Sequence, residues 1–302
     1  MIKLLLKKRS LIYLIFINIF CLFFSIDFVS AQDTQKQGQL LERGFNYTVG
    51  EKLTYSVTYM GIPVGWAILH LEEKTELNGR EVYHLSATAG TNAFWSKLYK
   101  VEDKIESFID CKGLYTWRFE KHIREGRYKC DEFMDYDQIN HIGTYRRHDR
   151  DDVVKTMELP EEVHDLLSGI YYFRTQDLKV GKSVFIKINS DEKNWNMKVD
   201  VLARKTKKVK QLGKVDAFKI EPKAEFKGMF IKRGRVFVWI TADKHRIPFL
   251  IETRVFHIGK IVAKLEKIEG LALPEVKQRV QPKNQENWQK LHERINRFGR
   301  RD

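Results

Sequence analysis

Apolar and polar residues alternate with a period of two along most of the chain from Tyr47 onward. In the first such stretch Leu53, Tyr55 and Val57 fall on one face, and polar residues fall on the other. Alternation of this kind is typical of half-buried β-strands. Asn78-Gly79, between two alternating stretches, predicts a tight hairpin. We therefore expect a mostly β chain whose successive strands pair antiparallel.

The pattern changes to a helical one between residues 161 and 174. Apolar residues recur there at helical spacing: Val163, Leu166, Leu167, Ile170 and Tyr171. This spacing predicts one face of an α-helix, and Pro160 and Glu161 suit its N-terminal turn. We expect a helix over residues 161–174 that joins two strand-rich halves.

The expected fold is a large, curved antiparallel sheet or half-barrel over residues 47–270, with this helix against its concave side. Barrels of this kind use interior space that side chains do not fill for apolar ligands. The candidate ligand-binding residues are aromatic: Trp66, Trp95, Tyr99, Tyr172 and Trp239. The alternative is that each of them is an ordinary core residue.

Residues 1–31 have the pattern of an export signal. A basic start precedes an apolar run from Leu11 to Phe24, and Val29-Ser30-Ala31 supplies small residues for cleavage. We expect cleavage near Ala31, a periplasmic or otherwise exported mature chain, and a flexible segment over residues 32–46. An uncleaved membrane anchor is the alternative, although the apolar run is short for a membrane span.

The chain is basic, with a formal net charge of +14. In an exported protein this charge favours anionic envelope polymers or lipid head groups as partners, rather than nucleic acid. Solubility alone is the alternative explanation.

The last residues form a basic amphipathic pattern. A polar linker over residues 271–286 precedes a tail over residues 287–302, and the tail predicts a short helix with an apolar stripe. The candidate contact residues are Trp288, Leu291, Arg294, Ile295 and Phe298. Such a tail can lie on an anionic membrane, dock to a partner or fold back on its own domain.

No spacing in the sequence predicts a catalytic or metal site. The nine histidines are scattered, and neither an HExxH pair nor a GxSxG elbow is present. His164, Asp165 and Ser168 lie close together in the sequence, but neighbouring helical residues point in different directions, so this group indicates a helix cap. We expect no catalytic residues, no metal and no cofactor.

Two further groups of residues are not expected to form a functional site or a disulfide. Asp243 to Arg246 bring four polar side chains together between two strands, a position typical of turn residues. Cys111 and Cys130 fall near opposite ends of a three-strand meander, too far apart for a disulfide.

Four stretches of the sequence are similar to the bacterial domain-of-unknown-function family 3108. They are GEKLTYSVTYMGIPVGWAILHLEE, YKVEDKIESFID, EVHDLLSGIYYFRTQDLKVGKS and VWITADKHRIPFLIETRVFHIGKIVAKLE, in the family's order. The resemblance implies an exported, mostly β domain with no established reaction. It places these residues on family motifs: Asp103, Ser107, Asp110, Asp165, Ser168, Tyr171, Arg174, Trp239, Asp243, Arg246 and Pro248.

Together these features favour a non-enzymatic envelope protein. It would bind or chaperone an amphiphilic or anionic component such as a lipid, a lipoprotein or a glycolipid. One alternative is an enzyme that acts on envelope glycans through carboxylates such as Asp103 and Asp110. Another is a scaffold for the assembly of envelope proteins.

Overall fold

The computed structural model describes residues 47–148, 153–190, 192–226, 229–230, 234–255 and 259–272. The predicted export signal, the flexible segment and the basic tail with its short helix lie outside these residues. The predicted linker lies outside them from residue 273 onward. No helix in the described ranges is long and apolar enough to cross a membrane.

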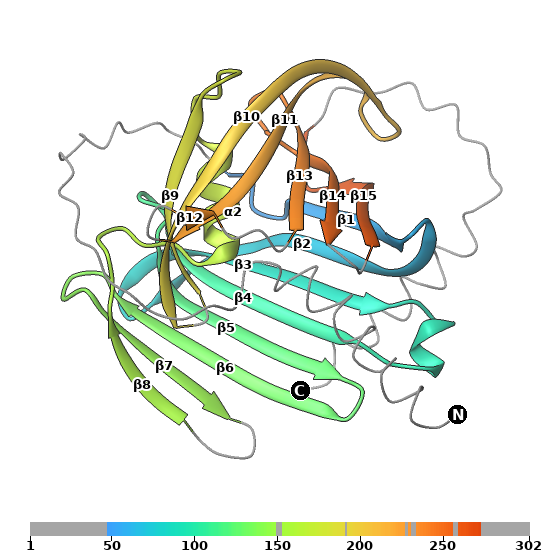
Figure 1. Cartoon of the computed structure of the whole chain (residues 1–302). Helices are drawn as coiled ribbons and strands as arrows, with labels where there is room; N and C mark the ends of the chain where they lie inside the picture. The colour runs from blue at the N-terminus through green and yellow to red at the C-terminus, as the bar shows by residue number, and fades with distance from the viewer. Residues whose placement is uncertain are drawn as a thin grey trace. The chain divides into compact units, whose positions relative to one another are not determined.

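The described residues form one antiparallel sheet and one α-helix (Figure 1). Eight strands precede the helix: β1 (Lys52–Tyr59), β2 (Ile62–Leu77), β3 (Arg80–Thr91), β4 (Glu102–Asp110), β5 (Thr116–Glu125), β6 (Tyr128–Asp137), β7 (Ile142–His148) and β8 (Val153–Glu158). Seven follow it: β9 (Ser183–Ser190), β10 (Lys193–Val209), β11 (Gly213–Phe226), β12 (Met229–Phe230), β13 (Gly234–Thr241), β14 (Pro248–Val255) and β15 (Gly259–Glu269). The helix is α2 (Leu166–Arg174), and a short 3-10 helix, η1 (Trp95–Lys97), connects β3 to β4.

The two strand-rich halves belong to the same sheet. Its order is β8-β7-β6-β5-β4-β3-β2-β1-β15-β14-β13-β11-β10-β9, with β12 paired to β11. The first and last strands of the chain, β1 and β15, therefore pair at the centre, and β8 and β9 are the two edges. The prediction of a mostly β fold with one large open antiparallel sheet and one helix is confirmed.

The sheet curves around α2, so that its two edges approach each other without pairing (Figure 1). Lys155 Nζ on β8 lies 2.7 Å from Glu192 Oε2 in the turn after β9, and Asn194 Nδ2 donates to Glu158 O at 2.8 Å. No ladder between β8 and β9 is present among the described strands. Side chains rather than backbone hydrogen bonds therefore connect the edges.

The segment before α2 bridges the interior between the two halves. Thr116 N on β5 donates to Val163 O at 3.2 Å. His164 N donates to Lys187 O at 2.9 Å and its carbonyl accepts from Asn189 N at 2.7 Å, both on β9. These bonds satisfy backbone groups that would otherwise be buried without partners.

The helix begins later than the sequence pattern predicts. Asp165 is its N-cap, and its carboxylate accepts from Leu167 N at 2.6 Å and Ser168 N at 3.0 Å. Glu162 has a positive φ of 51°, which ends the preceding turn instead of starting a helix. The prediction that the helix begins at Glu161 is therefore wrong, because Val163 and His164 bond to strands.

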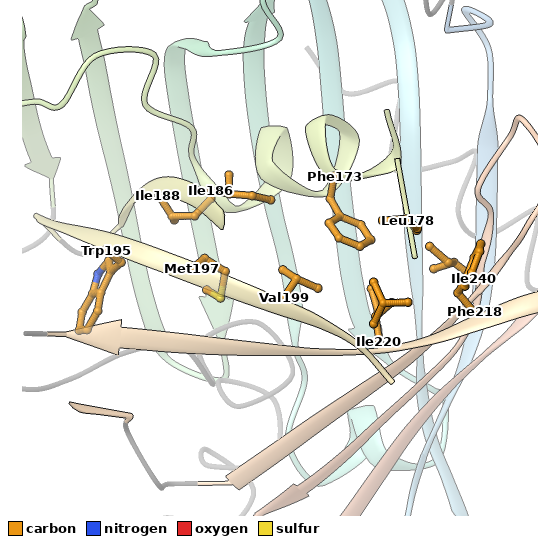
Figure 2. Close-up of a cluster of buried hydrophobic side chains, with 11 residues drawn as sticks. Phe173, Leu178, Ile186, Ile188, Trp195, Met197, Val199, Phe218, Ile220 and Ile240 are labelled. Atoms are coloured by element: carbon orange, nitrogen blue, oxygen red, sulfur yellow. The ribbon is translucent and has the colours of Figure 1, made fainter. Parts of the chain in front are cut away.

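The core lies on both sides of α2. Figure 2 shows Phe173 of the helix pointing toward the strands of the second half. The hydrophobic cluster on this side of the helix comprises Phe173, Leu178, Ile186, Ile188, Trp195, Met197, Val199, Val201, Phe218, Ile220 and Ile240. A second cluster in the first half comprises Met134, Tyr136, Tyr145, Leu159 and Val163. Helix and core side chains therefore occupy much of the space that the sequence analysis left for a ligand.

A buried ion pair ties the helix to the centre of the sheet. Arg174 Nη1 and Nη2 donate to Glu51 Oε1 and Oε2 at 2.6 and 2.7 Å, and both side chains are 2 % exposed. Arg174 Nη2 also donates to His245 O at 2.8 Å. The rings of Tyr47 and Tyr171 lie 5.4 and 4.9 Å from the guanidinium carbon. One side chain thus connects α2, the approach to β1 and the β13–β14 turn.

Candidate functional site

A cavity of about 50 Å³ lies between the first half of the sheet, the start of α2 and the β9–β10 turn. Its apolar lining comes from Ile105, Phe119, Ile123, Phe133, Met134, Tyr136, Tyr145 and Leu166. Its polar lining comes from Asp103, Lys121, Glu125, Glu132, Asp165, Asn189, Ser190 and Glu192. The cavity therefore combines an apolar wall with an unusual number of acids.

Strand alternation places a pair of these acids side by side. Ser107 donates to the Asp165 carboxylate at the cap of α2, so Asp103, four residues earlier on β4, shares this inner face of the sheet. On β5, Lys121 pairs with Ile105 and Glu125 bridges Val101. Asp103 and Glu125 are consequently diagonal neighbours on adjacent strands.

The Asp103–Glu125 pair is buried and incompletely satisfied. Asp103 is 7 % and Glu125 1 % exposed. Asp103 Oδ1 accepts from Arg124 N at 2.8 Å, whereas no N–H donor among the described residues reaches either Glu125 oxygen. Burial, and then the charge of Asp103, raise the pKa of Glu125 to about 8. Glu125 therefore holds a proton at neutral pH, and its carboxyl group can share that proton with Asp103 at the wall of the cavity.

The predicted aromatic residues do not meet at this cavity. Trp66 packs over Gly90 on the outer face, and Lys207 Nζ covers the Trp239 ring at 4.1 Å. Trp95 Nε1 donates to Pro63 O at 3.1 Å in the β3–β4 connection, where Tyr99 also lies. Tyr172 on α2 packs against the His164 ring, with centroids 4.4 Å apart. None of the five is among the residues that line the cavity.

The carboxylates that the sequence offered for catalysis do not converge either. Asp110 Oδ1 accepts from Lys112 N and Gly113 N, both at 2.8 Å, and so closes the β4–β5 turn. Asp103 lies at the other end of β4. Its neighbour Glu125 was missed because a charged residue in a strand is normally read as solvent-facing. The available signal was its position two residues after the inward-facing Ile123, where the alternation expects an apolar side chain.

His164, Asp165 and Ser168 form a helix cap, as the sequence analysis predicted. The Asp165 carboxylate accepts from Ser107 and from Thr116 Oγ1, in addition to the two helix amides. Burial lowers the pKa of His164 to about 3, and its Nδ1 lies 3.1 Å from Leu114 O. A neutral histidine held by a carbonyl and a fully bonded aspartate do not form a nucleophilic triad.

The two other structural predictions are also confirmed. Asp243 Oδ1 accepts from Thr241 Oγ1 at 2.8 Å, His245 N at 2.9 Å and Arg246 N at 3.2 Å, which makes it the organiser of a turn. Cys111 and Cys130 are both free thiols.

Comparison with known proteins identifies the family of this chain. A family model described as "Protein of unknown function (DUF3108)" matches residues 54–266. The chain belongs to the DUF3108 family. This DUF3108 match begins within β1 and ends within β15, so it includes the strands between them, α2 and the residues that line the cavity. The resemblance noted from the four sequence stretches is confirmed.

The fold of this DUF3108 domain is similar to that of a solved structure. A β-barrel-like protein of the domain of unknown function DUF1849 from Brucella abortus has 9 % identity and a TM-score of 0.50, over 73 % of this chain and 97 % of that one. This likeness concerns the fold alone. A candidate exported protein with a YmcC-like fold from Bacteroides fragilis has 10 % identity over 73 % of this chain and 96 % of that one. Its TM-score of 0.31 is too low to support an argument. A comparison with curated proteins found no match.

Proposed function

We propose that this chain is a non-enzymatic, exported envelope protein that binds the end of an amphiphile in the cavity between β4–β7 and α2. The observation that carries the proposal is a largely apolar cavity that contains a buried pair of carboxyl groups, Asp103 and Glu125. Binding sites typically combine apolar walls with a few polar groups that fix the ligand's orientation.

The size of the cavity limits what can enter it. Pockets that hold a whole small molecule have volumes of about 300–1,000 Å³, and this one has about 50 Å³. It therefore accepts only one end of a ligand, while the remainder lies along the inner face or in solvent. A chain-like molecule meets this requirement better than a compact one.

The acids define the polar part of the ligand. Protonated Glu125 can donate one hydrogen bond, and the adjacent Asp103 can accept one. A neutral group that both accepts and donates, such as a hydroxyl beside an ester, matches this pair. Glu132 and Glu192 add negative charge to the lining, so an anionic group is disfavoured here. We therefore favour a lipid or glycolipid with a neutral polar group at the cavity.

The glycan-directed enzyme is the second candidate, because an adjacent carboxyl pair with a raised pKa is also typical of acid–base catalysis. Glycoside hydrolysis, however, needs space for a sugar and its glycosidic bond between two separated carboxyl groups. A cavity of about 50 Å³ does not provide that space. The binding function is therefore better supported.

The envelope location in this proposal depends on the signal-like start and the basic composition of the sequence. The tail residues Trp288, Leu291, Arg294, Ile295 and Phe298 remain the candidate membrane contact, with anionic lipid as their partner. Basic residues outside the cavity could thus hold the protein near the surface that supplies its ligand.

The proposal predicts that the protein retains an amphiphile when it is purified from its own envelope without detergent. Organic extraction and mass spectrometry should then find one lipid class in near-stoichiometric amount. As a control, the protein is washed with salt and with lipid vesicles before extraction. The wash should remove lipid bound to the surface of the protein, whereas a lipid held in the cavity should remain. Recovery of only the bulk lipid mixture, or of no lipid, would contradict the proposal.

A further inference from the structure

The outer face of the sheet carries a second cluster, on the opposite side of β4 and β5 from the cavity. Glu106 on β4 is the direct cross-strand partner of Glu120 on β5, and His122 follows two residues later on the same face. One ligand atom from each of these three residues lies within 4.8 Å of the others. The side chains are 13, 19 and 26 % exposed, so solvent ions can reach them.

The spacing of the three atoms suits a tetrahedral metal ion. His122 Nε2 lies 3.6 Å from Glu106 Oε2 and 3.6 Å from Glu120 Oε2. Zinc bonds of about 2.0–2.1 Å at tetrahedral angles separate neighbouring ligand atoms by roughly 3.3–3.5 Å. The two distances to His122 Nε2 are therefore within a few tenths of an ångström of those in a zinc site, and the two carboxylate oxygens lie within 4.8 Å of each other.

The surrounding residues orient these atoms as outer-shell groups do in metal sites. Asp131 Oδ1 lies 2.8 Å from His122 Nδ1, which directs the lone pair of Nε2 toward the two glutamates. Glu106 Oε1 is held by His84 Nε2 at 2.9 Å and by Lys104 Nζ at 2.8 Å, leaving Oε2 toward His122. Carboxylate–histidine pairs of this kind fix the ring of a ligating histidine.

The charges of Glu106 and Glu120 also favour a bound cation at this point. Like charges placed directly opposite each other on neighbouring strands destabilise a sheet. Glu106 and Glu120 are such a pair, and their Oε2 atoms both face the Nε2 of His122. Lys104 Nζ at 2.8 Å from Glu106 and Arg118 Nε at 3.8 Å from Glu120 offset part of this repulsion. A divalent cation or a protonated His122 between the two Oε2 atoms would offset more of it.

We propose that Glu106, Glu120 and His122 form a binding site for a divalent transition-metal ion, best matched by Zn²⁺, with a fourth position open to water. Three ligands of the nitrogen and carboxylate types with an open position suit zinc better than calcium or magnesium, which take oxygen ligands in larger numbers. Such spacing is not visible in the sequence, because the ligands come from two strands and only the sheet brings them together. The site is independent of the amphiphile cavity.

The test is a calorimetric titration of the mature protein with Zn²⁺ after chelator treatment. The wild type should bind one ion with a dissociation constant in the micromolar range or below, and Zn²⁺ should raise its unfolding temperature. His122→Ala and Glu120→Gln should each abolish saturable binding. Asp131→Asn should weaken binding about 10–100-fold, because Asp131 positions the histidine without touching the metal.

His245→Ala is the matched control, because His245 lies in the β13–β14 turn, in the other half of the sheet from β4 and β5. This variant should bind Zn²⁺ like the wild type. Glu120→Gln keeps the test informative if His122→Ala does not fold. Two results would overturn the proposal. The first is a wild type without saturable Zn²⁺ binding, which would mean that the cluster is an ion pair centred on protonated His122. The second is wild-type affinity for Zn²⁺ in folded His122→Ala or Glu120→Gln.

Discussion

Replacing Arg174 with methionine is expected to lower the free energy of unfolding by about 3–5 kcal/mol, because it leaves the Glu51 carboxylate buried without a partner. Both oxygens of Glu51 accept from Arg174, and both side chains are 2 % exposed. The substitution also removes a donor to His245 O and the cation between Tyr47 and Tyr171. Chemical denaturation monitored by tryptophan fluorescence measures the change.

An exposed ion pair provides the matched control. Arg204 Nη2 lies 2.6 Å from Asp216 Oδ2, but these side chains are 56 and 45 % exposed. Arg204→Met should change the free energy of unfolding by less than about 1 kcal/mol, because water screens surface pairs. The double variant Glu51→Gln with Arg174→Met should be less destabilised than Arg174→Met alone, since it removes the unpaired charge. Equal effects of Arg174→Met and Arg204→Met would show that the buried pair does not tie α2 to the sheet.

Glu125→Gln is expected to remove a loss of stability at alkaline pH. Burial, followed by the charge of Asp103, raises the pKa of Glu125 from 4.5 to about 8 in the folded protein. Between these two values the folded state binds more protons than the unfolded state, so stability falls as pH rises, and above about pH 8 the loss is complete. One pKa unit corresponds to about 1.4 kcal/mol. Allowing for coupling and residual hydration, we expect the variant to gain about 2 kcal/mol over the wild type between pH 5 and pH 9.

Denaturation midpoints of the wild type and the variant across this pH range measure that gain. Other groups also titrate, so the difference between the two proteins is the relevant quantity. Glu81→Gln is the control, because Glu81 is an exposed acid on β3, paired with Lys74 at 2.9 Å. Water screens this exposed pair, so the variant should differ from the wild type in the free energy of unfolding by less than about 1 kcal/mol. A difference between wild type and Glu125→Gln that stays constant from pH 5 to pH 9 would mean that Glu125 is ionised throughout.

Local sequence pattern was sufficient to predict the class of fold. Alternation and turn residues identify strands because they depend on neighbouring residues only, as Asn78-Gly79 between β2 and β3 illustrates. The pairing of the first strand with the last, at the centre of the sheet, was not predicted. β1 and β15 are separated in the sequence by nearly the whole domain, and no local pattern in either strand indicates that the two pair with each other.

The site was predicted less well, for two physical reasons. The five aromatic candidates were chosen by residue type, whereas the face of the strand decides what each one contacts; Trp66 and Trp239 lie on the outer face. Inward-facing acids are unusual, so Glu125 was not considered. The helix also fills more of the interior than expected, because Leu167 and Tyr171 are buried along with Phe173. Interior volume cannot be estimated from alternation alone.

The most direct test of the proposed function is a titration of the mature protein with a fluorescent long-chain monoacylglycerol at pH 7. Ile123→Trp places a larger side chain in the cavity lining, and Ile123→Phe is a smaller version for use if the first variant unfolds early. Thr144→Trp is the control, because Thr144 lies on the outer face of β7 beside the cavity residue Tyr145. We expect the wild type and Thr144→Trp to bind the probe with equal affinity, and the Ile123 variants to bind it at least about tenfold more weakly, a difference of about 1.4 kcal/mol. Equal binding by a folded Ile123 variant and the wild type would contradict the assignment of this cavity as the amphiphile site.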